Sequence, residues 1–548
     1  MQKLLFLILI CPGLYSQDLD KILWGETQLS GPINFDFISS ELENYSTNNI
    51  SGIFSINPYP KGLGVNLLKS EEIFETRNTN ELFREFPEFM LNISVKDNKA
   101  FIENKGIIET KHEFWDLSFT NGNAWNDKQN IYISIPFALL QKNANCTHNG
   151  ILIFALNKTI NSSQAIFQIS SETCAYFQFN YVAIFESNFE EQEVNFVEYE
   201  YDFNIREFDD IYKKYPDIEM NSFADSSEFD DDELTTYGFY DGQDHFIGPC
   251  KTRSGDYPFC LDILLPAYSL TKTISGTLGV AAYEKKYGSI KDLEVNDLLS
   301  FCTNKKWDDV TLENLADMTT GNYKSQVHSE DEDSLSSLNF IFNLHDSHEK
   351  EDFACNNYPR KSKPNLKFVY HSSDTYLLGL ALNKLLLANE ENDFFNDLLL
   401  PIFSDINLSE SIKHIRRTND KKRQPYTGWG MFFEREDLIK LNNIIRSNVK
   451  DKFFSKDYID EAMQLTNDNG FEAIRSSNIY YNNGVWAAKF DKKIFNCDKD
   501  LYVPFMSGFG GITVVFLPNS MLYYYVSDNY TFSWYSAVYA AHKMEPLC

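Results

Sequence analysis

A strongly acidic stretch divides this sequence into two parts with different residue patterns. It covers residues 189–235 and ends in the run Glu228–Glu233. Short β-type runs precede it, whereas helical and β-type patterns alternate after it. The chain has 548 residues, which is too long for one ordinary domain. The division therefore predicts a domain over residues 17–200, an acidic linker over 201–239 and a second domain over 240–548.

The first part has the pattern of an all-β domain. Its β-type runs include Ile131–Pro136, Gly150–Leu156 and Ala165–Ser170, with Asn- and Gly-rich turns between them. Several short strands without helical periodicity are typical of a β-sandwich. No motif in this part suggests chemistry, which favours a structural or docking role and leaves carbohydrate or surface binding open. The alternating patterns after residue 240 predict an α/β or α+β domain.

The N-terminal end has the layout of a secretory signal peptide. Lys3 precedes the apolar run Leu4–Ile10, and small residues follow up to Ser16. The run is far shorter than the roughly 18 residues that span a bilayer, and no later stretch is long enough. We expect cleavage after residues 1–16 and a secreted or periplasmic protein without a membrane span. Glycosylation is left open.

The cysteine count fits an oxidising compartment. Removal of Cys11 with the signal peptide leaves an even number, eight, for which we expect disulfides rather than a metal site. The sequence does not fix the pairing. Cys250 and Cys260 are the nearest pair that a bridge can close.

The net charge argues against nucleic-acid binding. Acidic residues outnumber basic ones by 79 to 49, which gives −30, and such a chain repels phosphate backbones. The densest basic run, Arg416–Arg423, is interpreted as a solvated loop, and the charged stretch Ser325–Lys363 as an insertion loop.

One helical segment carries the residues of a nucleophilic site. Ser269 and Lys272 are three residues apart at the start of a pattern rich in small residues. This spacing puts both side chains on one helical face, where the amine can reach the hydroxyl. A lysine whose pKa is lowered by burial can take the proton of a serine and make it a nucleophile.

The Ser-x-x-Lys string alone is weak evidence. It also occurs at Ser347/Lys350 and Ser447/Lys450, which we place in a charged loop and at a polar helix end. The alternative for Ser269 is a helix N-cap serine with a surface lysine nearby.

Further segments strengthen the nucleophile interpretation. Tyr370-His-Ser-Ser-Asp-Thr lies downstream, and Met506-Ser-Gly-Phe-Gly-Gly-Ile follows later. Together with Ser269-x-x-Lys272, these resemble the three motifs of the serine β-lactamase and penicillin-binding-protein superfamily. Two other segments agree, Leu315–Gly321 and Thr427–Leu438. The resemblance covers roughly residues 240–540 and is closest to the esterase-like class C branch, in particular to 6-aminohexanoate-oligomer hydrolase-type members.

The resemblance implies a fold and a set of roles. The fold is α+β, an antiparallel sheet flanked by helices with a helical subdomain, here after an N-terminal all-β domain. By position, Ser269 is the acylated nucleophile, Lys272 and Tyr370 move protons, and Ser372 is a hydrogen-bonding partner for the lysine or the substrate. The oxyanion hole combines the backbone N–H groups of Ser269 and Ile512. Phe509, Gly510 and Gly511 border the substrate.

One position departs from the family pattern. Phe509 stands where β-lactamases and related peptidases carry a cation, and a phenyl ring cannot bind a carboxylate. The resemblance therefore implies a serine hydrolase that acts on a less charged, small-molecule or peptide-like ester or amide without a cofactor. A penicillin-recognising peptidase or β-lactamase, and a catalytically silent binding protein, stay open as alternatives. The substrate, the ester or amide preference and the oligomeric state are not predicted.

Overall fold

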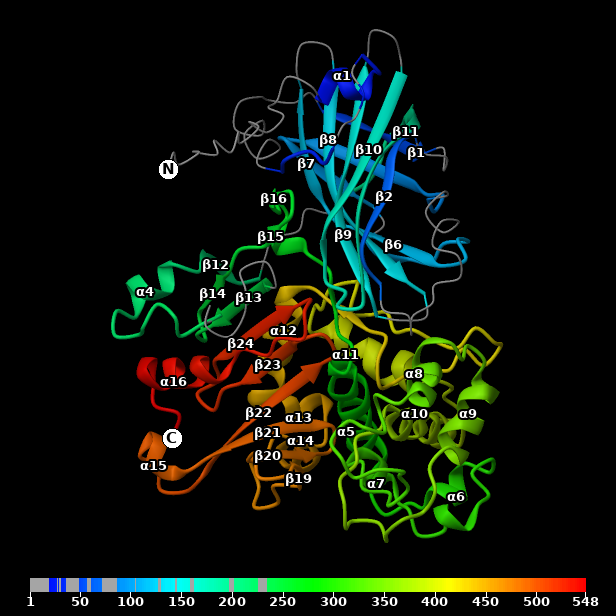
Figure 1. Cartoon of the computed structure of the whole chain (residues 1–548), viewed down its shortest axis with the longest axis vertical. Coiled ribbons are helices and arrows are strands. Elements are labelled where there is room, and N and C mark those ends of the chain that lie inside the picture. The colour runs from blue at the N-terminus through cyan, green and yellow to red at the C-terminus, as the bar shows by residue number, and fades with distance from the viewer. Residues whose placement is uncertain are drawn as a thin grey trace, which may run out of the picture.

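The computed structural model describes residues 19–26, 28, 31–35, 49–56, 61–70, 86–103, 105–126, 130–142, 145–157, 162–196, 202–224 and 234–548. The expected signal peptide, residues 1–16, lies outside this part of the chain. The described part is α+β. One large sheet, formed by the N-terminal strands, stands above a second sheet and its helices in Figure 1.

The N-terminal sheet has eleven strands and closes on itself. β8 (Asn130–Gln141) pairs with β9 (Thr147–Asn157) along one edge and with β6 (Trp115–Phe119) and β7 (Gly122–Asn126) along the other. The ring continues through β4, β3, β1, β11 and β10 back to β9. These strands and their neighbours are β1 Ile50–Ile56, β2 Lys61–Ser70, β3 Met90–Lys96, β4 Lys99–Ile102, β5 Gly106–Ile108, β10 Ser162–Glu172 and β11 Phe177–Glu191; a short helix, α1 Leu19–Leu23, precedes them.

This closed sheet differs from the two packed sheets of the expected sandwich. Aromatic rings fill its interior; for example, Phe167 lies with its centroid 4.4 Å from that of Phe86 and 4.8 Å from that of Phe185. β8 and β9 are buried along their whole lengths. Strands covered on both faces do not show the alternation that separates the two sheets of a sandwich.

The second sheet has nine strands in the order β12-β14-β13-β24-β23-β22-β21-β20-β19. The strands are β12 Asn204–Glu207, β13 Leu234–Tyr240, β14 Asp244–Ile247, β19 Phe471–Ile474, β20 Ile479–Asn482, β21 Val485–Phe490, β22 Leu501–Gly508, β23 Ile512–Phe516 and β24 Leu522–Ser527. All neighbours are antiparallel except β12 and β14. Parts of the expected acidic linker thus form strands β12 and β13. They join the sheet because residues such as Phe239 are fully buried there.

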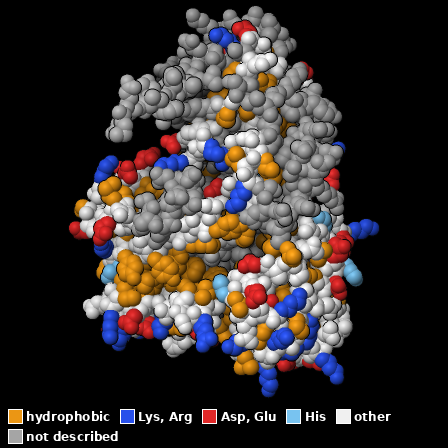
Figure 2. Space-filling model, viewed as in Figure 1, with side chains coloured by type: hydrophobic (Ala, Val, Ile, Leu, Met, Phe, Trp, Pro, Cys, Tyr) orange, Lys and Arg blue, Asp and Glu red, His pale blue; other side chains and the backbone are white. Residues whose placement is uncertain are grey.

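Both faces of this sheet are buried, and successive residues of a strand enter different cores. In β23, Val514 belongs to one core and Val515 to the other. The Val515 face is covered by α16 (Tyr535–Met544) and α4 (Asp210–Lys214). The Val514 face shares its core with the helical region and with the N-terminal sheet. Figure 2 shows hydrophobic side chains gathered over the region that α16 occupies, where Tyr535 and Tyr539 are exposed.

The helical region lies mostly between β14 and β19 in sequence. Its helices are α5 Leu278–Tyr287, α6 Val295–Leu298, α7 Leu312–Ala316, α8 Leu335–Phe342, α9 Ser347–Asn356, α10 Ser372–Leu387, α11 Leu400–Asp405, α12 Arg435–Arg446, α13 Lys450–Phe453 and α14 Lys456–Ala462; α15 Lys492–Phe495 follows β21. One short hairpin, β15–β16 (Lys251–Thr252, Gly255–Asp256), and one two-stranded pairing of distant segments, β17–β18 (Leu265–Pro266, Phe432–Phe433), complete the set. No helix of the described residues is long and apolar enough to cross a bilayer.

The stretch Ser325–Lys363 is not an open insertion loop. It contains α8 and α9, and both Ser347 and Lys350 are buried in α9. The Lys350 amine donates to the backbone carbonyl of Phe340 and lies over the rings of Phe340 and Tyr426. A long lysine side chain can be buried in this way when a hydrogen-bond acceptor satisfies its amine.

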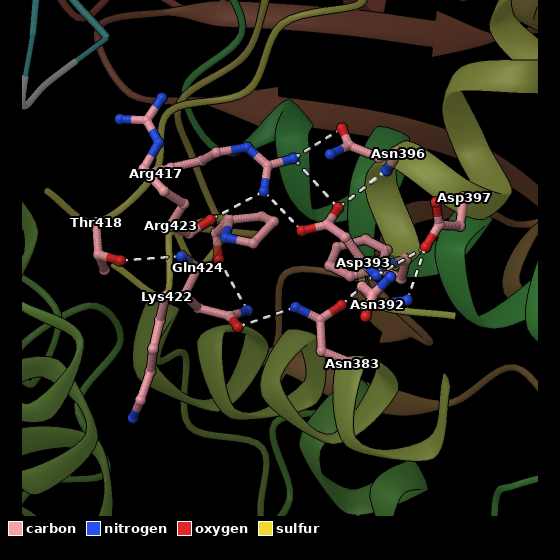
Figure 3. Close-up of polar contacts among 12 residues, drawn as sticks. Asn383, Asn392, Asp393, Asn396, Asp397, Arg417, Thr418, Lys422, Arg423 and Gln424 are labelled. Atoms are coloured by element: carbon pink, nitrogen blue, oxygen red, sulfur yellow. Dashed lines mark hydrogen bonds and ion pairs between the residues drawn. The ribbon is translucent and has the colours of Figure 1, made fainter. Parts of the chain in front are cut away.

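The basic run Arg416–Arg423 is solvated only at its end, where Lys421, Lys422 and Arg423 are exposed as expected, and not at Arg416 and Arg417. Arg417 binds both carboxylate oxygens of Asp393, with N–O distances of 2.6 and 3.2 Å (Figure 3). Arg416 is buried and pairs with Asp116 of β6. The run therefore neutralises internal carboxylates and joins the helical region to the N-terminal sheet.

Four disulfides are formed: Cys146–Cys174, Cys250–Cys260, Cys302–Cys355 and Cys497–Cys548. The pair Cys250–Cys260 confirms the bridge that the sequence favoured. Disulfides of this number are typical of proteins in an oxidising compartment. We expect the exported protein, denatured without reductant, to show no more than one free thiol on titration. Four or more free thiols would contradict these pairings.

Candidate active site

The chain makes a tight turn immediately before Ser269. β17 ends at Pro266, and Tyr268 has a φ of +42°, which is rare for a residue with a side chain. A π-helical segment, Lys272–Thr277, then leads into α5. π-helical turns are frequent at functional sites. The turn leaves Ser269 partly exposed while the residues around it are buried.

The small residues after Ser269 allow close packing. A Cβ atom added at Gly279 would lie 3.0 Å from the ring of Phe394, and one at Gly276 would lie 3.3 Å from the methyl group of Thr375 in α10. α5 is therefore a central, buried helix, as the sequence predicts. This packing fixes the position of the Lys272 side chain, which starts on the same face.

Lys272 is buried and hydrogen-bonded to Ser269. Its Nζ atom lies 2.9 Å from Ser269 Oγ, 2.9 Å from Ser372 Oγ and 3.2 Å from the carbonyl oxygen of Gly428. Burial lowers the pKa of Lys272 to about 8, against the opposing effect of the negative charge of Glu332. A lysine with this pKa is partly neutral near physiological pH, and its neutral amine can accept a proton.

Tyr370 also lies beside Ser269 and Lys272. It lies two residues before α10, and the centre of its ring is 4.8 Å from Lys272 Nζ. Burial, and then the charge of Glu332, raise the pKa of Tyr370 far above its ordinary value, although a hydrogen bond with Ser269 acts in the opposite direction. Tyr370 therefore keeps its proton and can donate it.

Ser372 begins α10 and binds the carboxylate of Glu332. Its backbone N–H donates to Glu332 at 2.9 Å, and its hydroxyl donates to the other carboxylate oxygen of Glu332. Glu332 was not predicted as a site residue. The one sequence feature that could have indicated it is its place in the acidic run Glu330–Asp333, inside the stretch interpreted as an insertion loop.

His371 holds this loop in place. Its Nε2 atom lies 3.0 Å from a carboxylate oxygen of Asp331, and both side chains are buried. Asp331 also accepts hydrogen bonds from the backbone N–H groups of Lys324 and Ser325. Hydrogen bonds to Asp331 and Asp374 raise the pKa of His371 to about 9 despite its burial. A charged His371 thus ties the segment that carries Glu332 to the second motif.

Ser269 opens into a cavity of about 440 Å³. Its wall is mainly apolar and aromatic, and two carboxylates also line it; no Lys or Arg does so among the residues that the structure describes. The lining residues that matter below are Ser269, Tyr370, Ser372, Glu332, Asp333, Trp429, Trp486, Ser507, Gly508 and Phe509. A cavity of this size holds a small organic group.

The third motif is placed differently from the expectation. Phe509 lines the cavity, together with Ser507 and Gly508 at the end of β22, whereas Gly510, Gly511 and Ile512 are not part of the lining. Gly510 and Gly511 form the turn between β22 and β23 with φ angles of +81° and +101°. A Cβ at Gly511 would lie 2.3 Å from the carbonyl oxygen of Thr531. The glycine pair therefore serves a tight turn, and Ile512 is fully buried behind it.

The N-terminal sheet reaches this site. Asn145, before β9, lines the cavity; its amide donates to the carbonyl of Met431 at 2.7 Å and its carbonyl accepts from the N–H of Gly430. The ring of Tyr176 packs 6.2 Å from that of Phe509. These contacts hold the loop after α11 and the third motif against the end of the N-terminal sheet.

One cluster in the described residues has metal-ligand chemistry. The side-chain ligand atoms of Cys146, His148 and Cys174 lie within 4.8 Å of one another. Cys146 and Cys174 are joined in a disulfide, so their sulfur atoms are not thiolates that could bind a metal ion.

Comparisons with known proteins find similarity among solved structures. No family model matches the chain, and no curated protein matches it. Among solved structures, the chain is similar to "Putative 6-aminohexanoate-dimer hydrolase from Bacillus anthracis", at 16% identity and a TM-score of 0.42, over 58% of this chain and 81% of that chain. It is also similar to a class C β-lactamase, at 13% identity and a TM-score of 0.39, over 57% of this chain and 92% of that one. At these values, the function proposed below depends on the geometry of the site.

Proposed function

We propose that the protein is an exported serine hydrolase that cleaves an ester or amide through an acyl-enzyme on Ser269. The observation that carries this proposal is the buried Lys272 amine, 2.9 Å from a Ser269 hydroxyl that opens into an apolar cavity. Lys272 takes the proton of Ser269, and the oxygen attacks the carbonyl carbon of the substrate. Tyr370 donates a proton to the leaving group. Water then releases the acid.

The negative oxygen of the tetrahedral intermediate needs two N–H donors. We propose that Ser269 supplies one and that Phe509 supplies the other, in place of Ile512. Phe509 lines the cavity at the end of β22, whereas Ile512 does not. The preceding Gly508 approaches the nucleophile turn so closely that an added Cβ would lie 3.1 Å from the carbonyl oxygen of Ala267.

The N-terminal sheet has a supporting role in this proposal. Asn145 and Tyr176 contact the loop and the turn that border the cavity. The four disulfides fit the oxidising compartment that the expected signal peptide implies. We therefore expect removal of the N-terminal sheet to disturb the active site.

The proposal is tested by mass spectrometry of the intact protein after reaction with a fluorophosphonate. We expect one adduct on the intact protein, located after digestion on the peptide that contains Ser269. A parallel reaction with benzylpenicillin distinguishes the penicillin-recognising alternative, because only a site that accepts β-lactams is acylated by it. The absence of a fluorophosphonate adduct on Ser269 would favour a catalytically silent binding protein.

The substrate is expected to be uncharged around its acyl group. β-Lactams carry a carboxylate, and the described cavity lining offers it no Lys or Arg but two carboxylates, Glu332 and Asp333. Like charges in a cavity of low polarity repel strongly. We therefore predict that a short-chain p-nitrophenyl ester is hydrolysed at least about a hundredfold faster than nitrocefin, as kcat/KM at the same pH. Comparable turnover of the two would show that the site accepts β-lactams.

A further inference from the structure

Glu332 lies at the end of a hydrogen-bonded chain that leads to the nucleophile. Its carboxylate accepts from the backbone N–H and from the hydroxyl of Ser372. Ser372 Oγ lies 2.9 Å from Lys272 Nζ, which lies 2.9 Å from Ser269 Oγ. Four side chains from three separate segments are thus connected in the order Glu332, Ser372, Lys272 and Ser269.

The chemistry of these groups fixes the direction of the hydrogen bonds. An ionised carboxylate only accepts, and a serine hydroxyl has a single proton to donate. Ser372 gives that proton to Glu332. Towards Lys272 it can then act only as an acceptor.

This direction determines how a neutral Lys272 can be oriented. A neutral amine has two N–H bonds and one lone pair. Ser372 Oγ and the carbonyl oxygen of Gly428 both accept from Lys272 Nζ, so they take the two N–H bonds. The lone pair is left for Ser269, the one neighbour of the three that has a proton to give. If Ser372 were free to turn its hydroxyl towards Lys272, it would compete with Ser269 for that lone pair.

We propose that Glu332 is a positioning residue that directs the lone pair of Lys272 at the Ser269 hydroxyl, acting through Ser372. This inference rests on the proposed function and extends it to a residue outside the three motifs. Glu332 itself does not need to contact the substrate for this role. Its charge also favours the protonated form of Lys272, so the same residue influences when the base is available.

The surroundings of Glu332 keep it in place. Its neighbour Asp331 is bound to His371 and to two backbone N–H groups, which anchors the loop. The titratable groups that interact with Lys272 or with Glu332 in the described residues come from several elements. They are Tyr370, His371 and Asp374 around α10, Tyr358 after α9, and Asp333 in the loop itself.

The test is the pH profile of fluorophosphonate labelling and of p-nitrophenyl ester hydrolysis in Glu332→Gln. The profile of the unaltered protein should rise with pH through about 8, because Lys272 must be neutral to act as a base. In Glu332→Gln the negative charge that favours protonated Lys272 is lost. The rising limb should therefore move to lower pH, by about one unit. The plateau at high pH should fall about tenfold or more, because the Ser372 hydroxyl is no longer fixed as an acceptor.

Two further variants separate the charge from the hydrogen bond. Glu332→Asp keeps the charge but shortens the side chain. The plateau of its pH profile at high pH should therefore fall, while the rising part of the profile stays at the pH of the unaltered protein. In a Ser372→Ala background, Glu332→Gln should still move the limb but should cause no further loss of plateau. Such non-additivity is the sign of residues that act through one another.

Glu330→Gln is the matched control. It makes the same change two residues away, where the Glu330 carboxylate accepts from the Ser325 hydroxyl. The profile of Glu330→Gln should match that of the unaltered protein. A plateau that does not fall in Glu332→Gln, or a plateau that falls further when Glu332→Gln is added to Ser372→Ala, would overturn the inference, because positioning through Ser372 acts on the plateau whereas the charge acts on the limb. If Ser269 is labelled normally in that case, the proposed function stands without Glu332. If Ser269 of the unaltered protein is not labelled, both fail.

Discussion

Replacement of Ser269 by Ala is expected to abolish acylation and to lower kcat by about 10⁴ to 10⁶. Lys272→Met should have an effect of similar size, because methionine fills the same space but cannot take the proton of Ser269. Lys272 is 2% exposed, so its replacement by an apolar side chain of similar length should preserve packing. The measurements are ester hydrolysis, fluorophosphonate labelling and circular dichroism of both variants.

Ser447→Ala is the control for this experiment. Ser447 also begins a Ser-x-x-Lys string, but it follows α12, donates to the carbonyl of Ile444, and its Lys450 is paired with Asp460. Ser347 is a poorer control because it is buried and its hydroxyl binds Asp420. Labelling that persists in Ser269→Ala, or activity that persists in Lys272→Met, would place the active site elsewhere.

The local parts of this site could be predicted from the sequence. Ser269 and Lys272 are three residues apart, and the helical geometry that joins them depends on the residues between and just after them. Ser372 follows Tyr370 by two residues, so both were found as one motif. That they lie near Ser269 was expected from the resemblance alone; in the structure, Lys272 Nζ lies 2.9 Å from both Ser269 Oγ and Ser372 Oγ.

The parts that come from distant segments could not be predicted. Glu332 reaches Ser372 because the Asp331–His371 pair docks its loop, and nothing in the acidic run Glu330–Asp333 indicates that pairing. The closure of the N-terminal sheet depends in the same way on the pairing of β1 with β11, in which Gly52 lies opposite Glu191. Charge patterns alone also misplaced Arg416, whose partner Asp116 lies in the other part of the chain.

In the third motif, a shift of a few residues along the chain changes which residues line the cavity. In β-type backbone, successive side chains point to opposite faces, so a shift in register changes which groups meet the cavity. The sequence placed Gly510 and Gly511 at the substrate and Ile512 at the oxyanion. The two glycines, whose φ angles are positive, instead form the turn between β22 and β23, and Ser507, Gly508 and Phe509 line the cavity.

Tyr370→Phe is expected to affect substrates according to their leaving group. Burial raises the pKa of Tyr370 far above its ordinary range, so the residue keeps its proton and is not available as a second base; in the proposed mechanism it donates that proton to the leaving group. An alkyl amide or alkyl ester cannot lose its leaving group without a proton, and loss of a general acid costs about 10² to 10⁴ in rate. A p-nitrophenolate leaves as an anion and needs no such donor.

The experiment therefore compares two substrates with the same acyl group in the unaltered protein and in Tyr370→Phe. The p-nitrophenyl ester should lose less than about tenfold in its acylation rate, whereas the alkyl amide or ester should lose about 10² or more. Tyr481→Phe, a nearby buried tyrosine whose ring lies 6.3 Å from that of Tyr370, controls for the loss of a hydroxyl in the same aromatic cluster. Equal losses on both substrates would mean that Tyr370 acts before the leaving group departs, as a partner of Lys272 in the activation of Ser269. The leaving-group dependence thus assigns the proton that Tyr370 moves, which neither its position nor its burial does alone.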